Sequence, residues 1–390
     1  MRTTNSITTS VVAAAVLVVA GCGSDTSATS GSPTSGSAAP TGSAPVSGGP
    51  GAGGFGNLQP ITEVNLNTNG DSPGGANTAD VVNAVNAFLA TLDDATRDKV
   101  EFDFSENKAR QTWSNYPASV VQREGPALSD LTADQQKAVD AVLQVALSGD
   151  GYQQDGDIRK ADDYLNSLGG QGGDDFGSLK DYHVAVYGQP SATQPFMIQF
   201  GGHHLARNLT YNGDKVSQTP QFVGSEPTAF QVNGAPVEPV KAEASAMFGM
   251  LAALTDDQRK SAEITSGTFD DLVMGPGKDT GNFPTPEGVL VSDLNDNQRQ
   301  AVTAAIQAYA GDLNTGAATK LVAKYESELD QTRVGWSNNT GPTDENSYIR
   351  IDGPSVWIEF INTRSMSTPN IHYHSVYRDK TDDYGSSKPS

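Results

Sequence analysis

Four of the chain's five histidines occur in two close pairs, and such pairs are a common source of metal ligands. His203 and His204 are adjacent, His372 and His374 are separated by one residue, and His183 stands apart. Residues i and i+2 of a strand project from the same face, so His372 and His374 can direct both imidazoles at one point. Adjacent residues project to opposite faces, so only one member of the first pair is expected to share that point.

An alignment of the two histidine segments selects His203 as the partner of the second pair. Aligning Arg207 with Arg378 places His203 over His374, with the histidine and the arginine four residues apart in both segments. The predicted site therefore consists of three imidazoles, from His203, His372 and His374. A fourth position is left open for water or a substrate.

Three imidazoles form a donor set that suits a borderline transition metal, with zinc or copper expected first. Calcium and magnesium prefer oxygen ligands, and zinc with three protein ligands is the catalytic arrangement. His204, Glu226 and Glu359 are candidate fourth ligands, and either glutamate could act as a general base. Histidine pairs on strands also occur as packed residues or in active sites without metal; both alternatives stay open, and for His183 and His204 a structural role is favoured.

Two arginines and an acid-rich stretch are further candidates. Arg207 and Arg378 could bind an anionic substrate group, because the guanidinium fork suits carboxylate or phosphate. They could equally brace the aspartates of residues 379–383, and this structural role is favoured. Residues 150–163 hold five acids but lack the alternating acids and closing Glu of a calcium-binding EF-hand. We expect that stretch to be a solvated connection between helices.

The elements that must position these residues occur twice along the chain. Residues 88–97 (FLATLDDATR) resemble 250–259 (MLAALTDDQR), and 128–136 (LSDLTADQQ) resemble 291–299 (VSDLNDNQR). Both matches have an offset of roughly 160 residues, and self-similarity at a fixed period is typical of a repeat. The shared order and spacing predict an internal duplication, with one half at 59–240 and the other at 241–390.

Each half combines helix-start patterns with short strands. A Thr or Asn precedes a Gln by three residues, the capping-box pattern, at Thr132 and Gln135, Thr255 and Gln258, and Asn295 and Gln298. Short alternating runs predict strands at 184–188 (VAVYG), 196–200 (FMIQF), 349–353 (IRIDG) and 356–360 (VWIEF). Helices followed by β hairpins, twice over, predict an α+β fold rather than a parallel sheet. We expect two helix-plus-β-hairpin halves packed about a pseudo-two-fold axis.

The N-terminus has the pattern of an exported lipoprotein. The apolar run at 11–20 (VVAAAVLVVA) suits the core of a signal peptide and is too short for a spanning helix. The run leads into Cys22, in a sequence that resembles the bacterial lipobox, so residues 1–21 are expected to be cleaved and Cys22 lipidated. Residues 22–58 are almost entirely small or Pro and predict a flexible tether. An ordinary signal peptide with an incidental cysteine is the alternative.

Cysteine and charge content narrow the expected partners. Cys22 is the single cysteine, so neither an intrachain disulfide nor a thiolate metal site in the fold is expected. The formal net charge is −21, from 25 Lys and Arg against 46 Asp and Glu. Such a surface repels nucleic acid, so nucleic acid is excluded as a partner. The expected location is the extracytoplasmic face of the cell membrane, held through the lipid anchor.

Three segments carry a resemblance to a known family. They are FGGHHLARNLTY (200–211), FVGSEP (222–227) and NIHYHSVYRDKTDDYG (370–385). With these motifs the chain resembles the domain of unknown function 3500 family over most of its length after the tether. The resemblance implies that the family pattern includes His203, His204, His372, His374 and Arg378. It implies no activity, because the family name carries none.

Three classes of function remain compatible with these features. The first is a metal-dependent enzyme on the cell exterior, acting on a small-molecule substrate. The second is a non-catalytic lipoprotein that binds a metal or a small ligand. The third is a structural or adhesive envelope protein in which the histidines only hold the halves together. A buried, positioned acid near the histidines would favour hydrolysis over storage.

Overall fold

The structure, a computed structural model, describes residues 61–169, 176–365, 367–368 and 370–387. These residues belong to one unit that begins at Gly54. The expected signal peptide, the lipidation site Cys22 and the tether at 22–58 lie outside the described residues. Within the described ranges, no helix has the length and apolar content needed to cross a membrane.

The helices begin with the caps that the sequence predicts. At Thr132, Thr255 and Asn295 the side chain accepts from the backbone N–H three residues later, and the Gln side chain accepts in return. These reciprocal bonds satisfy backbone donors that the first helical turn leaves free. The helices are α1 (Thr78–Leu89), α2 (Asp94–Val100), α3 (Asn107–Arg110), α4 (Ala133–Ala146), α5 (Gly149–Leu168), α6 (Lys241–Ala252), α7 (Asp256–Ser261), α8 (Asp296–Ala310) and α9 (Thr315–Ser327).

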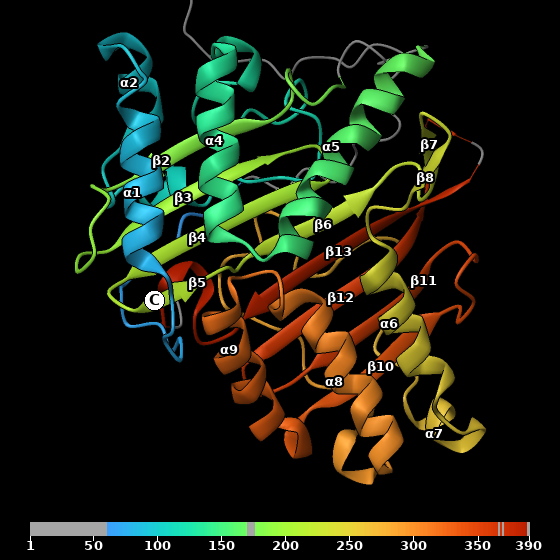
Figure 1. Ribbon diagram of the computed structural model, residues 1–390. Helices are drawn as coiled ribbons and strands as arrows, with labels where there is room; N and C mark the ends of the chain where they lie inside the picture. Colours follow the sequence, from blue (N-terminus) through green and yellow to red (C-terminus); the bar gives the residue numbers. More distant parts are fainter. Residues whose placement is uncertain (1–60, 170–175, 366, 369, 388–390) are drawn as a thin grey trace, which may run out of the picture. The chain divides into compact units, whose positions relative to one another are not determined.

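One large mixed sheet forms the centre of the fold (Figure 1). Its order within the described residues is β1-β2-β3-β4-β6-β13-β12-β11-β10-β9, with β5 paired to β4; β7 and β8 form a separate hairpin. The strands are β1 (Glu101–Phe102), β2 (His183–Tyr187), β3 (Phe196–Gly202), β4 (Leu205–Asn212), β5 (Lys215–Ser217), β6 (Gln221–Ser225), β7 (Phe230–Val232), β8 (Ala235–Val237), β9 (Val289–Leu290), β10 (Arg333–Asn338), β11 (Ser347–Asp352), β12 (Val356–Arg364) and β13 (Ile371–Asp379). The fold is therefore α+β, and all four predicted strands are present.

The pairing of β6 with β13 joins strands that are far apart in the sequence. The two strands are antiparallel, and Gly224 lies opposite His374. On its other side β6 pairs with β4, where Val223 lies opposite Leu205. The sheet therefore runs without a break from strands before residue 240 to strands after residue 241. Both histidine segments lie beside this junction.

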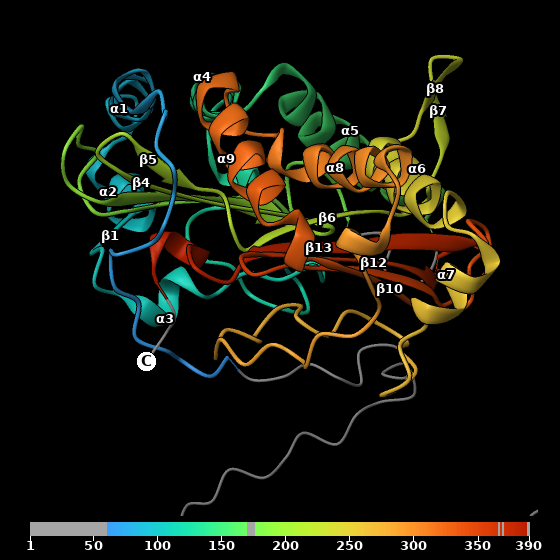
Figure 2. The same cartoon turned by 90° about the horizontal axis from the view of Figure 1, so that it is seen from below.

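Helices cover one face of the sheet and irregular chain covers the other (Figure 2). Apolar side chains from α1, α4, α5, α6, α8 and α9 pack with alternate strand residues in the main core. On the opposite face, Trp113 and Leu272 pack against strand residues of two smaller clusters. These two residues come from the segments 103–124 and 262–288, which contain little regular structure. Apart from the short α3, which lies in segment 103–124, loops cover this face, which we call the helix-free face, and these loops can supply functional groups.

The acid-rich stretch is not the solvated connection that we expected. It lies within α5, and Asp155 and Asp162 are each 1% exposed. These acids share a helix face with Ile158 and Leu165, at the i, i+3, i+7 and i+10 spacing of a buried stripe. Each buried carboxylate has a basic partner, since Asp155 pairs with Arg207 and Asp162 with a histidine of the β3–β4 turn.

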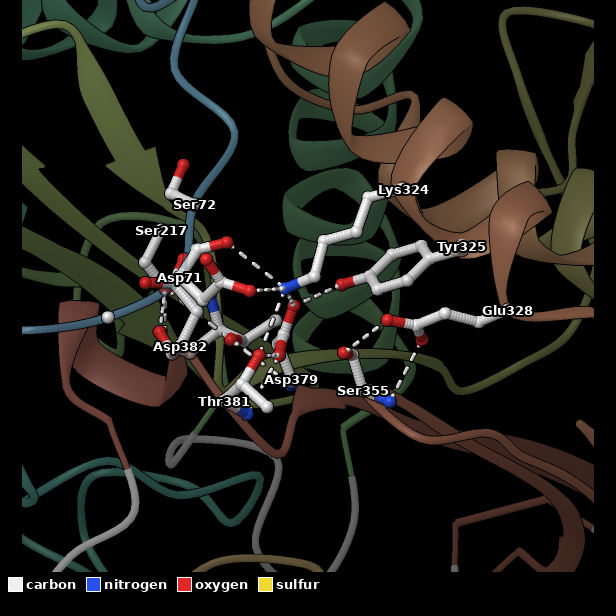
Figure 3. A network of polar contacts seen from close by, with 12 residues as sticks. Asp71, Ser72, Ser217, Lys324, Tyr325, Glu328, Ser355, Asp379, Thr381 and Asp382 are labelled. Atoms are coloured by element: carbon white, nitrogen blue, oxygen red, sulfur yellow. Dashed lines mark hydrogen bonds and ion pairs between the residues drawn. The ribbon is translucent and has the colours of Figure 1, made fainter. Parts of the chain in front are cut away.

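A buried polar network ties the N-terminal segment, α9 and the C-terminal segment together (Figure 3). The Lys324 ammonium lies 3.2 Å from Asp379 Oδ2 and 2.9 Å from Thr381 Oγ1, and donates to the backbone oxygen of Asp71 at 3.1 Å. The Tyr325 hydroxyl donates to the same Asp379 carboxylate at 2.7 Å. Because Lys324 and Tyr325 hold Asp379, this acid is not the partner of either arginine singled out in the sequence.

Candidate metal centre

Three histidine side chains converge on the helix-free side of the sheet. His374 Nε2 lies 2.9 Å from His372 Nε2 and 3.2 Å from His204 Nε2. One ring nitrogen of each residue lies within 4.8 Å of the other two, and all three residues are buried. We call these residues the three-histidine cluster. It is the arrangement of nitrogen donors that the sequence predicted, with one member exchanged.

The two histidines of β13 hold the positions expected from strand geometry. His372 lies opposite Thr363 of β12, and His374 lies opposite Ile361. Both share a sheet face with Val376, which packs in the core on the helix-free side. Their ring centroids are 4.5 Å apart. The predicted direction of both imidazoles toward one point is thus confirmed.

His204 joins the cluster from the turn between β3 and β4. Its φ of 60° lies in the left-handed region, which is uncommon for a residue with a side chain. Two backbone bonds hold it there: its N–H donates to Asn115 O at 3.1 Å, and its carbonyl accepts from Gly224 N at 2.8 Å. Gly224 also leaves space for the ring, because a Cβ there would lie 3.0 Å from His204 Cδ2.

His203, which the sequence alignment selected, does not point into the cluster. Its Nδ1 lies 2.7 Å from Asp162 Oδ1 on α5, although its ring lies 3.7 Å from that of His204. The alignment rested on equating Arg207 with Arg378, and these arginines lie on opposite faces of the sheet. Arg207 contacts acids of the helix layer, and Arg378 contacts the loop layer. The equivalence that selected His203 is therefore absent.

Asp271 fixes the orientation of His374 and was not singled out in the sequence. His374 Nδ1 lies 2.9 Å from Asp271 Oδ1, which also accepts from the N–H of Leu272. A carboxylate only accepts, so Nδ1 carries the proton and Nε2 keeps its lone pair. Asp271 lies in an irregular loop 103 residues from its partner, and no local pattern marks it.

Glu226 is one of the two predicted general bases. It is 5% exposed, and its Oε1 accepts from Ser367 N at 3.0 Å and from the Ser365 hydroxyl. Burial acts to raise the pKa of Glu226, but the neighbouring His372 and His203 and the hydrogen bonds from Ser365 and Ser367 lower it. Glu226 is therefore a buried, oriented carboxylate beside the three-histidine cluster.

Glu359, the other predicted base, has a different role. Its carboxylate accepts four hydrogen bonds, from Val273 N at 2.6 Å, Met274 N at 2.7 Å, Trp357 Nε1 at 2.7 Å and Tyr348 Oη at 2.8 Å. Two donors reach each oxygen. The structure therefore does not bring Glu359 to the histidines; it anchors the loop that carries Asp271.

Both arginines are braced by acids, but only Arg378 contacts one of the aspartates predicted as partners. Arg207 pairs with Asp155 and Asp312, and Arg378 pairs with Asp279 and Asp383. All of the partners except Asp383 lie outside the 379–383 stretch proposed from the sequence. Both guanidinium groups are buried and occupied by carboxylates, which leaves no donor fork facing a substrate. His183, the remaining histidine, places Nδ1 2.9 Å from Gly125 O.

Electrostatics keep two of the clustered rings neutral. Burial, with the neighbouring imidazoles, lowers the pKa of His204 well below its ordinary value. Burial and His374 lower the pKa of His372 to about 3. His203 differs: burial acts to lower its pKa, but the Asp162 carboxylate outweighs burial and raises it. At neutral pH His204 and His372 therefore offer unprotonated nitrogens, whereas the ring of His203 pairs with the Asp162 carboxylate.

The cluster has the dimensions of a three-nitrogen metal site. Two nitrogens bound to a tetrahedral metal at 2.0–2.1 Å lie about 3.3 Å apart. The observed separations of 2.9 and 3.2 Å are close to that value. The hydrogen bond from His374 to Asp271 reproduces the carboxylate–histidine contact that commonly orients a metal ligand. The residues present therefore fit a borderline metal ion.

A model of the family described as protein of unknown function (DUF3500) matches residues 74–386. The match includes both histidine pairs, Asp271 and Glu226. Comparisons with curated proteins and with solved structures gave no match. Because the matched region covers most of its length, the chain belongs to the DUF3500 family.

Proposed function

We propose that the three-histidine cluster binds one transition metal ion through the Nε2 atoms of His204, His372 and His374. The observation that carries the proposal is the convergence of three imidazole nitrogens, one of them oriented by Asp271. The donor set favours zinc or copper over calcium or magnesium. Three protein ligands leave a further position for a substrate atom or water, as in catalytic rather than structural zinc sites.

The activity proposed is metal-dependent chemistry on a small molecule, with hydrolysis as the first expectation. A bound metal would supply Lewis-acid polarisation of a substrate oxygen. Glu226 is proposed to hold and transfer a proton, because its carboxylate is buried, oriented by Ser365 and Ser367, and close enough to act on His372. This is the positioned acid that hydrolysis requires and storage does not.

The cellular setting is also a proposal. The lipobox-like sequence at Cys22 supports lipid anchoring at the extracytoplasmic face of a membrane. The net charge of −21 argues against nucleic acid as a partner. An internal duplication is proposed for 59–240 and 241–390, with His204 contributed by the first half and His372 and His374 by the second. The duplication is supported by the similarity of segment 88–97 to 250–259 and of segment 128–136 to 291–299.

A non-catalytic metal-binding lipoprotein is the second candidate. The observation in its favour is burial: His204 is 2% exposed and His372 and His374 are each 7% exposed. Such enclosure suits a carrier or sensor that retains its metal. The two candidates share the metal site. They differ in whether Glu226 transfers a proton in a reaction.

Elemental analysis of the purified full-length chain tests the metal site. One equivalent of zinc or copper is expected in the wild type and in His183→Ala, the matched control, because His183 lies outside the cluster. The double variant His372→Ala, His374→Ala is expected to lose it. X-ray absorption should count three imidazole ligands. Metal absent from the wild type after attempted reloading contradicts the proposal.

A second experiment separates catalysis from storage. Metal-loaded wild type and Glu226→Gln are assayed with p-nitrophenyl acetate and bis-p-nitrophenyl phosphate. An enzyme should hydrolyse one of them, and Glu226→Gln should keep the metal while losing on the order of 100-fold in rate. Full metal content with no hydrolysis by either protein favours the carrier.

A further inference from the structure

A cavity of about 540 Å³ lies beside the three-histidine cluster on the helix-free side of the sheet. Two loop segments, 113–121 and 268–278, form most of its wall, and Phe222 of β6 contributes from the sheet. The volume lies within the range of small-molecule sites, about 300–1,000 Å³. Its lining includes Trp113, Val121, Phe269, Asp270, Asp271 and Lys278.

The cavity wall is in direct contact with the cluster. Asp271 accepts from His374, and the Phe222 ring centroid lies 5.5 Å from that of His374. Asn115 accepts from the backbone N–H of His204. The cavity therefore borders the three-histidine cluster through Asp271 and Phe222, although no cluster histidine is among its lining residues.

The wall is aromatic and is held in place from behind. Trp113 is 3% exposed and its indole N–H donates to the hydroxyl of Tyr384 at 2.7 Å. The Phe269 ring lies 4.4 Å from that of Tyr348. Fixed aromatic faces favour flat, apolar ligand surfaces, which exclude water from them on binding. An inorganic anion would leave these faces unused.

The charges around the cavity favour a cation. Asp270 and Asp271 are adjacent in the 268–278 loop, and both line the cavity. Lys278 and Asp270 are both exposed, so solvent screens both charges, and Asp271 is the more enclosed of the two carboxylates. A cationic amine would meet two carboxylates and also gain from the aromatic faces. The net charge of −21 attracts such a ligand over a longer range.

We propose that this cavity binds a small organic molecule with an aromatic ring and a cationic amino group, the ring against Trp113 and Phe269 and the amine toward Asp270 and Asp271. The role of this cavity as the substrate pocket of the metal centre rests on the proposed function. Ligand binding to the cavity does not, because no residue of its wall needs a metal. The ligand class is defined by these two features alone.

The test uses matched probes that differ only in charge. Binding of 2-phenylethylamine, 2-phenylethanol and 3-phenylpropanoate to the full-length chain is measured by ligand-observed NMR and calorimetry, with and without added zinc. The amine is expected to bind more tightly than the alcohol, and the carboxylate not at all. Equal binding of all three, or preference for the carboxylate, overturns the proposal.

Two variants locate the site and one serves as a control. Asp270→Asn should weaken amine binding about twofold to fivefold, and Val121→Trp should abolish it by filling the space. Asp257→Asn removes an exposed acid of α7 and should change nothing. Unchanged affinity in Asp270→Asn overturns the proposed orientation even if Val121→Trp does not fold.

Metal content is measured on the same samples so that the two proposals fail separately. One equivalent of metal with no amine binding overturns the ligand proposal and leaves the metal centre intact. Amine binding that persists in the metal-free double variant His372→Ala, His374→Ala supports the cavity proposal whether or not the metal proposal holds.

Discussion

Asp271 and His374 are joined by a hydrogen bond of 2.9 Å across 103 residues of sequence. The bond connects an irregular loop to a central strand, and it reaches the ring nitrogen that does not face the cluster. It thereby fixes the tautomer that leaves Nε2 of His374 with its lone pair. It also fixes the ring plane, since a rotation would break the bond. Asp271 thus prepares His374 as a ligand without touching the metal position.

Asp271→Asn should therefore weaken metal binding while the fold is retained. Loss of such an outer partner typically lowers metal affinity about 10- to 100-fold. Zinc affinity is measured by competition with a chromophoric chelator. Asp257→Asn is the control, because it removes the same charge from an exposed position on α7. An affinity equal to that of the control would show that the bond does not orient His374.

His372 should make the metal-free protein sensitive to acid. Its pKa in the fold is lowered to about 3, mainly by burial, whereas an unfolded histidine has an ordinary value near 6.5. Below pH 6.5 the unfolded chain therefore binds a proton that the folded chain excludes, so the free energy of unfolding falls as pH falls. One such group contributes up to about 1.4 kcal/mol per pH unit.

The comparison with His372→Asn isolates this effect from the other titrating groups. Urea denaturation in the presence of EDTA gives the free energy of unfolding of both proteins between pH 7 and pH 4.5. The wild type should lose stability relative to the variant as the pH falls. A difference that stays constant over this range would mean that His372 is protonated as easily in the fold as in the unfolded chain.

Gly224→Ala should disturb both the sheet and His204. A Cβ at this position would lie 2.6 Å from Tyr373 O and 3.0 Å from His204 Cδ2, and the carbonyl cannot move without opening the β6–β13 pairing. We expect a loss of about 1–3 kcal/mol in the free energy of unfolding and weaker zinc binding. Gly249→Ala is the matched control, because nothing lies within 4 Å of a Cβ there in α6. It should stabilise by about 0.5–1 kcal/mol.

Local rules predicted the elements and the β13 pair from the sequence. The capping boxes at Thr132, Thr255 and Asn295 are formed, since each depends only on residues three positions apart. The i, i+2 spacing was sufficient to place His372 and His374 on one face, because strand geometry is nearly independent of the rest of the fold. These parts of the site needed no knowledge of the tertiary structure.

Long-range packing decided the remainder of the site. The choice between His203 and His204 depends on which partner each meets, Asp162 of α5 or His374 of β13, and neither contact has a sequence signal. The buried role of Asp162 was missed because a carboxylate on a helix predicts an exposed face unless its partner is known. Asp271 was missed for the same reason, since an irregular loop has no periodicity.

Glu359→Gln tests whether this glutamate is an anchor rather than a base. Each of its oxygens receives two donors, among them the backbone N–H groups of Val273 and Met274. An amide NH2 in place of one oxygen would face two donors without an acceptor, which should cost about 1–3 kcal/mol in the free energy of unfolding. The loop carrying Asp271 would also lose its attachment, so faster hydrogen exchange is expected at Val273 and Met274. Metal bound to the folded variant should keep its stoichiometry, because Glu359 contacts none of the three histidines directly. Loss of hydrolysis with normal stability and normal exchange would instead identify Glu359 as the base.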